Sequence, residues 1–102
     1  MFFHLRVFFM ESQWYLYVLR CGDGSLYTGI TTDVEKRFAA HQSGKGAKYT
    51  RGRGPLVIVY QERCGDHSEA LKREYAFKQL SREQKVAFLG QEKMGEKNIE
   101  LP

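Results

Sequence analysis

The chain has 102 residues, of which 42% are hydrophobic and 14% aromatic, and this suits one folded domain with one modest core. No run of residues approaches the roughly 18 apolar side chains of a membrane-spanning helix. Two cysteines are too few for a disulfide scaffold or a cysteine-based metal site. We therefore expect both to be reduced structural residues of a cytoplasmic protein.

The net charge of +4 is concentrated in one segment. From Lys36 to Gln61 the chain has six basic residues and no acidic one, while the remaining residues carry ten basic and twelve acidic side chains. A local positive field of this kind favours a polyanionic partner. The alternative is a solvated loop whose charge only keeps it soluble.

The first half of the chain predicts a β-hairpin followed by a helix. Trp14–Arg20 and Ser25–Ile30 are rich in aromatic and β-branched residues, and the two glycines between them suit a tight turn. Thr32 and Glu35 have the spacing of a capping box, which predicts a helix that continues to about Gln42.

The second half predicts a loop, a strand and two helices. Ser43–Gly54 holds four glycines and has no helical or strand period, so we expect a loop. Leu56–Tyr60 is a continuous apolar run, which predicts the central and most buried strand. Capping-box patterns at Asp66/Glu69 and Ser81/Gln84 predict helices that end near Leu80 and Gly90.

This order of elements predicts a small α+β domain with a three-stranded, mainly antiparallel sheet flanked by helices. Val34 and Phe38 of the first helix should cover the sheet, as should a second-helix stripe made of Ala70, Leu71 and Phe77. We expect the domain to span residues 13–90, between a flexible N-terminal appendage (1–12, with Met1 or Met10 as the start) and a flexible polar tail (91–102).

Several polar residues fall at positions that allow more than one interpretation. Tyr17 and Tyr27 are expected on paired strands, as packing residues or as site residues. Arg37 and His41 share one side of a helix, where either could be an ordinary charged residue at the surface or at the helix C-terminus. Glu74 projects from the apolar side of its helix, where the simplest interpretation is an ion pair with Lys78.

Taken together, the ordered set of motifs resembles the GIY-YIG nuclease superfamily, and in particular its small, stand-alone, uncharacterised bacterial members. The set consists of Tyr15-Leu16-Tyr17, Tyr27-Thr28-Gly29, Arg37 with His41, and Glu74. The resemblance extends over about residues 14–89. It implies that the protein hydrolyses phosphodiester bonds of nucleic acid with the help of one Mg²⁺ or Mn²⁺ ion. It also implies a role in DNA repair or recombination.

The resemblance also implies roles for single residues. Tyr17, Tyr27, Arg37, His41 and Glu74 would be catalytic, with Glu74 as the metal ligand, and Gly29 would be structural. Tyr15 replaces the first glycine of the family pattern, which is a backbone detail. Ile30 stands where some members have a lysine, so Lys45 or Lys48 would have to neutralise the phosphate.

The glycine-rich loop predicts contacts with a nucleic-acid backbone through Lys45, Lys48, Arg51 and Arg53, with Tyr49 available to stack on a base. No base-reading motif is visible, so we expect a monomer with structure-selective or weakly specific action, on DNA rather than RNA. A protein partner could add specificity. The alternative is a binding module that keeps the nuclease fold without efficient turnover.

Overall fold

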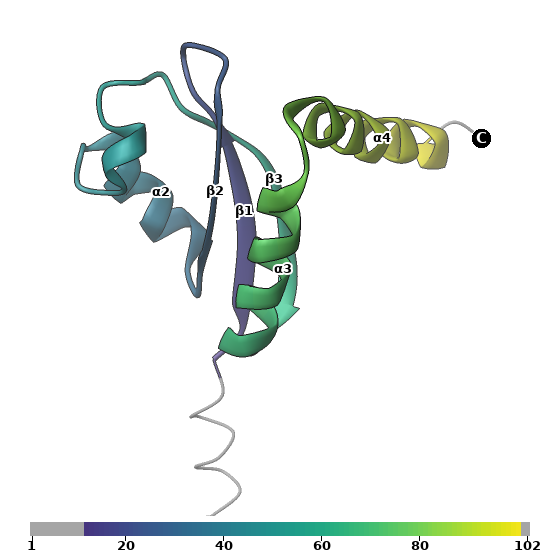
Figure 1. Ribbon diagram of the computed structural model, residues 1–102, viewed down its shortest axis with the longest axis horizontal. Coiled ribbons are helices and arrows are strands. Elements are labelled where there is room, and N and C mark those ends of the chain that lie inside the picture. Colours follow the sequence, from purple (N-terminus) through teal and green to yellow (C-terminus); the bar gives the residue numbers. More distant parts are fainter. Residues whose placement is uncertain (1–11, 101–102) are drawn as a thin grey trace, which may run out of the picture.

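The computed structural model describes residues 12–100, and their side chains as far as Gln91. The predicted appendage, except Ser12, and the last two residues of the predicted tail lie outside this range. The elements are β1 (Trp14–Arg20), β2 (Leu26–Thr31), α2 (Val34–Gln42), a 3₁₀ turn η1 (Lys48–Thr50), β3 (Val57–Gly65), α3 (His67–Gln79) and α4 (Arg82–Glu100). The predicted α+β class is confirmed (Figure 1).

The sheet has the order β2-β1-β3, and both neighbouring pairs are antiparallel. The prediction that Leu56–Tyr60 forms the central strand is therefore wrong, because β1 is central and β3 lies at an edge. The apolar run of β3 is only partly covered, and the side chain of Val57 is 43% exposed. A continuous apolar run shows that both faces are at least partly covered, but it does not say how many neighbours the strand has.

The sheet lies between α2 on one face and α3 on the other (Figure 1). Leu16 and Val18 of β1 pack against Phe77 of α3, whereas Tyr17 and Leu19 pack on the opposite face. All four side chains are at most 1% exposed. Successive strand residues alternate between faces, so burial of all four requires cover on both sides.

The helix starts are set by side-chain caps. Asp33, not the predicted Thr32, caps α2, and its carboxylate accepts a hydrogen bond from the Lys36 amide at 3.0 Å. The capping box of Asp66 and Glu69 at the start of α3 is confirmed. Reciprocal hydrogen bonds between Ser81 and Gln84 confirm the cap of α4 as well.

Two details of the helices differ from the predictions. Leu71 is 45% exposed, so the buried stripe of α3 consists of Ala70 and Phe77 alone. The predicted end of the last helix at Gly90 is wrong, since α4 continues to Glu100. A glycine costs about 1 kcal/mol within a helix, and the strong helix formers that follow it, among them glutamate and lysine, offset that cost.

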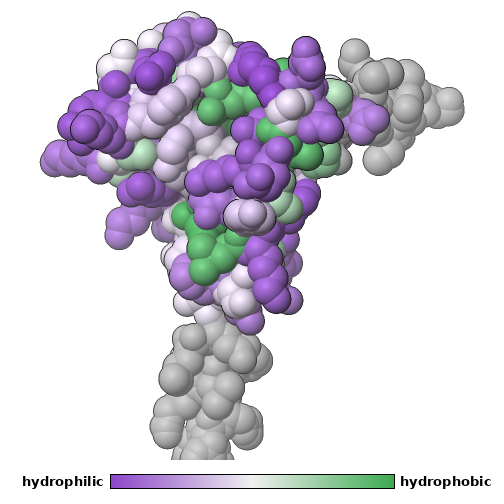
Figure 2. Space-filling view, in the orientation of Figure 1, coloured by the Kyte–Doolittle hydropathy of each residue, from purple (hydrophilic) through white to green (hydrophobic). Residues whose placement is uncertain are grey.

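The surface in Figure 2 is mainly hydrophilic, with small separate apolar patches. The exposed large hydrophobic side chains of the described residues are Tyr49, Val57, Leu71, Tyr75 and Val86, and they come from several elements. None of the helices in residues 12–100 combines the length and the hydropathy needed to cross a membrane.

Candidate active site

Tyr17 and Gly29 are cross-strand neighbours in the β1–β2 hairpin, and the large side chain of one requires the absence of a side chain on the other. The Tyr17 side chain is 1% exposed, and its hydroxyl passes directly over Gly29. A Cβ atom on residue 29 would lie 2.6 Å from the Tyr17 hydroxyl oxygen. The glycine therefore gives the tyrosine room to lie across the hairpin.

The Tyr17 hydroxyl is also hydrogen-bonded to His41. Tyr17 Oη lies 2.8 Å from His41 Nε2, and His41 Nδ1 lies 2.9 Å from Thr50 Oγ1. His41 and Thr50 are each only 2% exposed. The hydrogen-bond chain thus links β1, α2 and η1 in a buried environment. Gly46 is also part of this packing, because a Cβ there would lie 2.4 Å from His41 Nδ1.

The surrounding donors determine the protonation of His41. The backbone N–H of Ala47 can only donate, and it lies 3.3 Å from His41 Nδ1, so Nδ1 is an acceptor. Thr50 Oγ1 has one proton and two acceptors within reach, this nitrogen at 2.9 Å and the Ala47 carbonyl at 3.0 Å, so it can donate to Nδ1. We infer that the proton of the neutral ring is on Nε2, which donates to Tyr17.

Arg37 adds a positive charge beside this chain, and burial is the largest influence on the pKa values of Tyr17 and His41. Burial raises the pKa of Tyr17 to about 12, against the opposing influence of Arg37. Burial, followed by repulsion from Arg37, lowers the pKa of His41. Interaction with Tyr17 raises the pKa of Arg37 itself. At neutral pH the site therefore holds two neutral residues, Tyr17 and His41, beside one guanidinium.

Tyr27 connects the buried chain to the surface. Its ring meets His41 edge-on, with centroids 5.1 Å apart, and lies 6.0 Å from Tyr49 in a stacked arrangement. The guanidinium of Arg53 lies 4.2 Å from the centre of the Tyr49 ring and also pairs with Asp23 at 2.6 Å. Tyr49 and Arg53 are thus already engaged within the protein.

The strand β2 lies at one edge of the sheet, and its unpaired side is called the open edge below. Glu74 lies on α3, on the other face of the sheet from these rings. Its carboxylate is 3.0 Å from Lys78 Nζ, and the side chains of Glu74 and Lys78 are 19% and 49% exposed. Lys78 also lines a hollow of about 260 Å³ together with Tyr27 and Lys85. Glu74 itself does not line this hollow, and Lys78 is the residue that contacts the carboxylate and also lines the hollow with Tyr27. The alternative ion pair of the sequence analysis is present.

The donor set around Glu74 suits a weakly held, hard cation. Among the described residues no group of three or more His, Cys, Asp or Glu side chains could hold a metal ion. A single carboxylate leaves most coordination positions to water and substrate oxygens, which is how Mg²⁺ is commonly held at phosphoryl sites. The residues present fit such an ion, with Glu74 as its one protein ligand.

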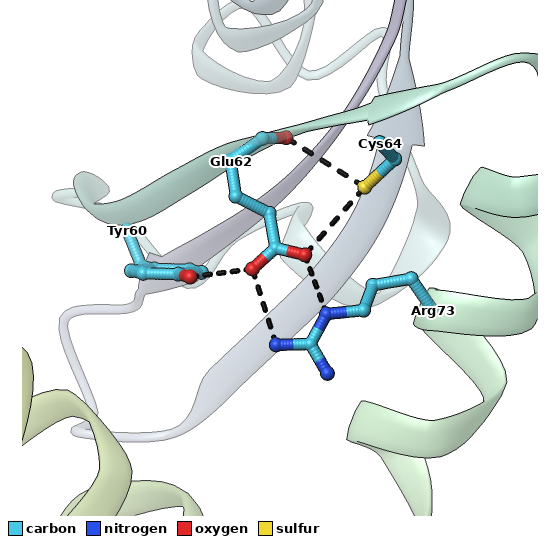
Figure 3. Close-up of polar contacts among 4 residues, drawn as sticks. All are labelled: Tyr60, Glu62, Cys64 and Arg73. Carbon is cyan, nitrogen blue, oxygen red and sulfur yellow. Dashed lines mark hydrogen bonds and ion pairs between the residues drawn. The ribbon is translucent and has the colours of Figure 1, made fainter.

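A polar cluster around Arg73, the residue before Glu74, ties α3 to β3 (Figure 3). Glu62 of β3 accepts hydrogen bonds from both Arg73 and Tyr60, and Cys64 donates a weak one at 3.6 Å. Burial alone would raise the pKa of Glu62, but Arg73 and Tyr60 outweigh it and hold this pKa low. Burial and Glu62 raise the pKa of Cys64, so its thiol stays protonated.

The remaining loop residues are at the surface. Lys45, Lys48 and Arg51 are exposed, and the backbone N–H of Gly22 donates to the Arg53 carbonyl at 2.6 Å, which docks the loop on the hairpin turn. Sequence reasoning did not identify Thr50, Gly46 or Lys85 as part of the site. In the sequence, the four-residue spacing between Glu74 and Lys78 was the one pattern that pointed to a cation of the hollow.

Comparisons with known proteins show the family to which the chain belongs. The GIY-YIG catalytic domain matches residues 13–87. A UPF0213 protein of Cupriavidus pinatubonensis is 61% identical over 79 residues, covering 78% of this chain and 88% of the relative. A UPF0213 protein of Cronobacter sakazakii is 57% identical over 74 residues, covering 72% and 78%.

Two solved structures share the fold. The solution NMR structure of a UPF0213 protein from Bacillus halodurans has a TM-score of 0.51 and 50% identity, covering 76% of this chain and 83% of that one. The solution NMR structure of a protein from E. faecalis has a TM-score of 0.57 and 45% identity, covering 83% and 93%.

The chain belongs to the GIY-YIG family, a family of nucleases that generally use divalent metal ions. Within that family it is similar to the small UPF0213 proteins.

The lowered pKa of His41 predicts a pH dependence of folding. The unfolded chain takes up a proton on this histidine below about pH 6.5, whereas the folded chain keeps the ring neutral to lower pH. The stability that the neutral ring contributes is therefore present above pH 6.5 and is lost as the pH falls towards the lowered pKa of His41 in the folded state, by up to about 1.4 kcal/mol per pH unit. Urea unfolding at several pH values measures this slope.

His41→Gln should remove the slope, while His67→Gln, at the exposed start of α3, should keep it. Asp23 and Glu62, whose pKa values are lowered, affect stability only below about pH 4.5. A slope that survives in His41→Gln would contradict the buried neutral imidazole.

Proposed function

We propose that this protein hydrolyses phosphodiester bonds of nucleic acid at the open edge of β2. The observation that carries the proposal is the linked set of Tyr17, His41, Tyr27 and Arg37. Hydrolysis requires a positioned water and positive charge facing the phosphate oxygens as they become more negative. The set provides both requirements.

Tyr17 acts as a positioning residue in this scheme. With a pKa of about 12, its ionisation at pH 7 would cost about 7 kcal/mol. Its oxygen accepts from His41, which leaves its own O–H available to Tyr27. Together Tyr17 and His41 hold the edge of the site in one arrangement rather than exchange protons.

Tyr27 is the tyrosine that can meet the substrate. It is half-buried, lines the hollow at the β2 edge, and lies beside Tyr17 with ring centroids 6.3 Å apart. In the proposed role its hydroxyl hydrogen-bonds the attacking water. The guanidinium of Arg37 interacts with both tyrosines and faces the phosphate as its negative charge grows.

Glu74 would hold one Mg²⁺ or Mn²⁺ ion. When bound, such an ion polarises the phosphate and stabilises the leaving oxygen. The hydrogen bonds between Arg73 and Glu62 tie α3 to β3 at the residue next to Glu74, and in this proposal they hold the carboxylate in place.

The substrate is proposed from the surface charge. Lys45, Lys48 and Arg51 are exposed, and their side chains make no hydrogen bond or ion pair within the described part of the chain, so they can follow a phosphate backbone. We favour DNA over RNA, structure-selective or weakly specific cleavage, and service in repair or recombination, as in related domains. A monomeric state and a cytoplasmic location complete the proposal, supported by scattered apolar patches and two free cysteines.

A second candidate function is nucleic-acid binding without efficient turnover. The ion pair of Glu74 with Lys78 favours it, because the carboxylate already has a partner. Ile30 in place of the family lysine points the same way. Incubating the protein with branched, nicked and single-stranded DNA and RNA, with Mg²⁺ or Mn²⁺, separates the two functions. Binding without any cleavage would establish the second.

Arg37→Ala should lower the single-turnover cleavage rate by roughly 10²-fold or more and leave affinity for the substrate near normal, because its charge acts on the transition state. Cleavage and binding are measured on the same labelled DNA. Lys36→Ala, the exposed neighbour on α2, is the matched control and should change the rate little.

If Arg37→Ala and Lys36→Ala weaken binding and cleavage in equal measure, Arg37 is only part of the basic surface. Glu74→Gln serves as the background control, since any cleavage that persists in it comes from another nuclease.

The paired reversal Lys48→Glu with Arg51→Glu should weaken binding to every DNA and RNA by about the same factor and flatten the salt dependence of the affinity. Titrations at several salt concentrations measure both effects. The thermal melt should stay close to that of the natural sequence, because both side chains are exposed. An unchanged salt slope would show that the loop does not contact the phosphates.

A further inference from the structure

Lys78 has two sets of neighbours in this structure. Its ammonium pairs with Glu74 at 3.0 Å, and its side chain lines the hollow that contains Tyr27. The side chain is 49% exposed, so nothing locks it in the ion pair. Lys78 can therefore reach either the carboxylate or a group bound in the hollow.

The hollow itself has the chemistry of a phosphate subsite. Its lining residues are Leu26, Tyr27, Thr28, Tyr49, Lys78 and Lys85, and none of them is acidic. Lys85 comes from α4, where its ammonium lies 5.9 Å from the centre of the Phe77 ring. Two lysines from two helices thus line one hollow together with Tyr27.

We propose that Lys78 is a switching cation, which holds Glu74 in the free protein and turns to a nucleic-acid phosphate in the hollow when a divalent ion takes the carboxylate. Lys85 makes the second contact to that phosphate. This assignment rests on the proposed nuclease function, and it provides the positive charge that Ile30 does not.

The two binding events become coupled through Lys78. The lysine and the divalent ion compete for the same carboxylate, so each must weaken the other's hold on Glu74. A half-exposed ion pair of this type changes an equilibrium by only about two- to fivefold, so the ion displaces it readily. Coupling between two ligands is reciprocal, and a phosphate that takes Lys78 therefore also favours the ion at Glu74.

The first test uses the full chain and Mn²⁺ alone, without nucleic acid. Broadening of the Glu74 amide signal in NMR spectra reports Mn²⁺ at this residue. Lys78→Gln should tighten Mn²⁺ binding there about two- to fivefold. Lys72→Gln, an exposed lysine on the same helix, should not. Equal Mn²⁺ affinity in the two variants would overturn the proposal.

The second test measures binding of a phosphorothioate-protected branched DNA with and without Mg²⁺. Mg²⁺ should tighten binding about two- to fivefold in the natural sequence and in Lys78→Arg, which keeps the charge. The enhancement should disappear in Lys78→Gln and in Glu74→Gln, and persist in Lys72→Gln. Persistence in Lys78→Gln would overturn the switch. Neither test requires cleavage. A protein that cleaves no substrate would therefore refute the nuclease proposal, while these two tests would still decide the proposal about Lys78.

Discussion

The hydrogen bond between Tyr17 and His41 is the contact on which the arrangement of the site depends. It joins the central strand to α2 in a place where both side chains are almost fully buried. The requirement for Gly29 and Gly46 follows from it, because each glycine makes room for one of the two rings. Through Thr50 the same chain also fixes the turn that presents Tyr49.

The site is formed where the two faces of the sheet meet, at the open edge of β2. Tyr27 belongs to the α2 face, whereas Lys78 belongs to α3 on the other face, and both line one hollow. The α2 face contributes the buried, neutral pair of Tyr17 and His41 with the guanidinium of Arg37 beside it, while the α3 side contributes the exposed ion pair. The groups that hold the site rigid thus lie on the α2 face, and the ion pair whose partners can exchange lies on the α3 face.

The local patterns of the sequence predicted much of the fold. Caps and turn residues are short-range signals, so the hairpin and the starts of α3 and α4 were predicted correctly. The strand order was not, because a run such as Leu56–Tyr60 shows that a strand is covered but not which strands lie beside it. The end of α4 was missed because a single glycine was given too much weight.

Residues of the candidate site could be predicted from the sequence only where they belong to a recognisable motif. The spacing of Tyr17, Tyr27, Arg37 and His41 brought those residues to attention, and the structure brings them together. Thr50 and Lys85 have no such signal, since a threonine in a loop and a lysine on a helix are ordinary. They join the site only because tertiary packing brings η1 and α4 to it.

The stability of Tyr17→Phe, measured by urea unfolding at pH 7 beside Tyr15→Phe, tests the central claim most directly. The first change removes one hydroxyl and leaves the buried Nε2–H of His41 without its partner, so we predict a loss of about 1–3 kcal/mol. Tyr15 is half-buried on the same strand, and its hydroxyl makes no hydrogen bond within the described part of the chain, so removing that hydroxyl should lower the stability by no more than about 0.5 kcal/mol. Equal stability of the two variants would contradict the account.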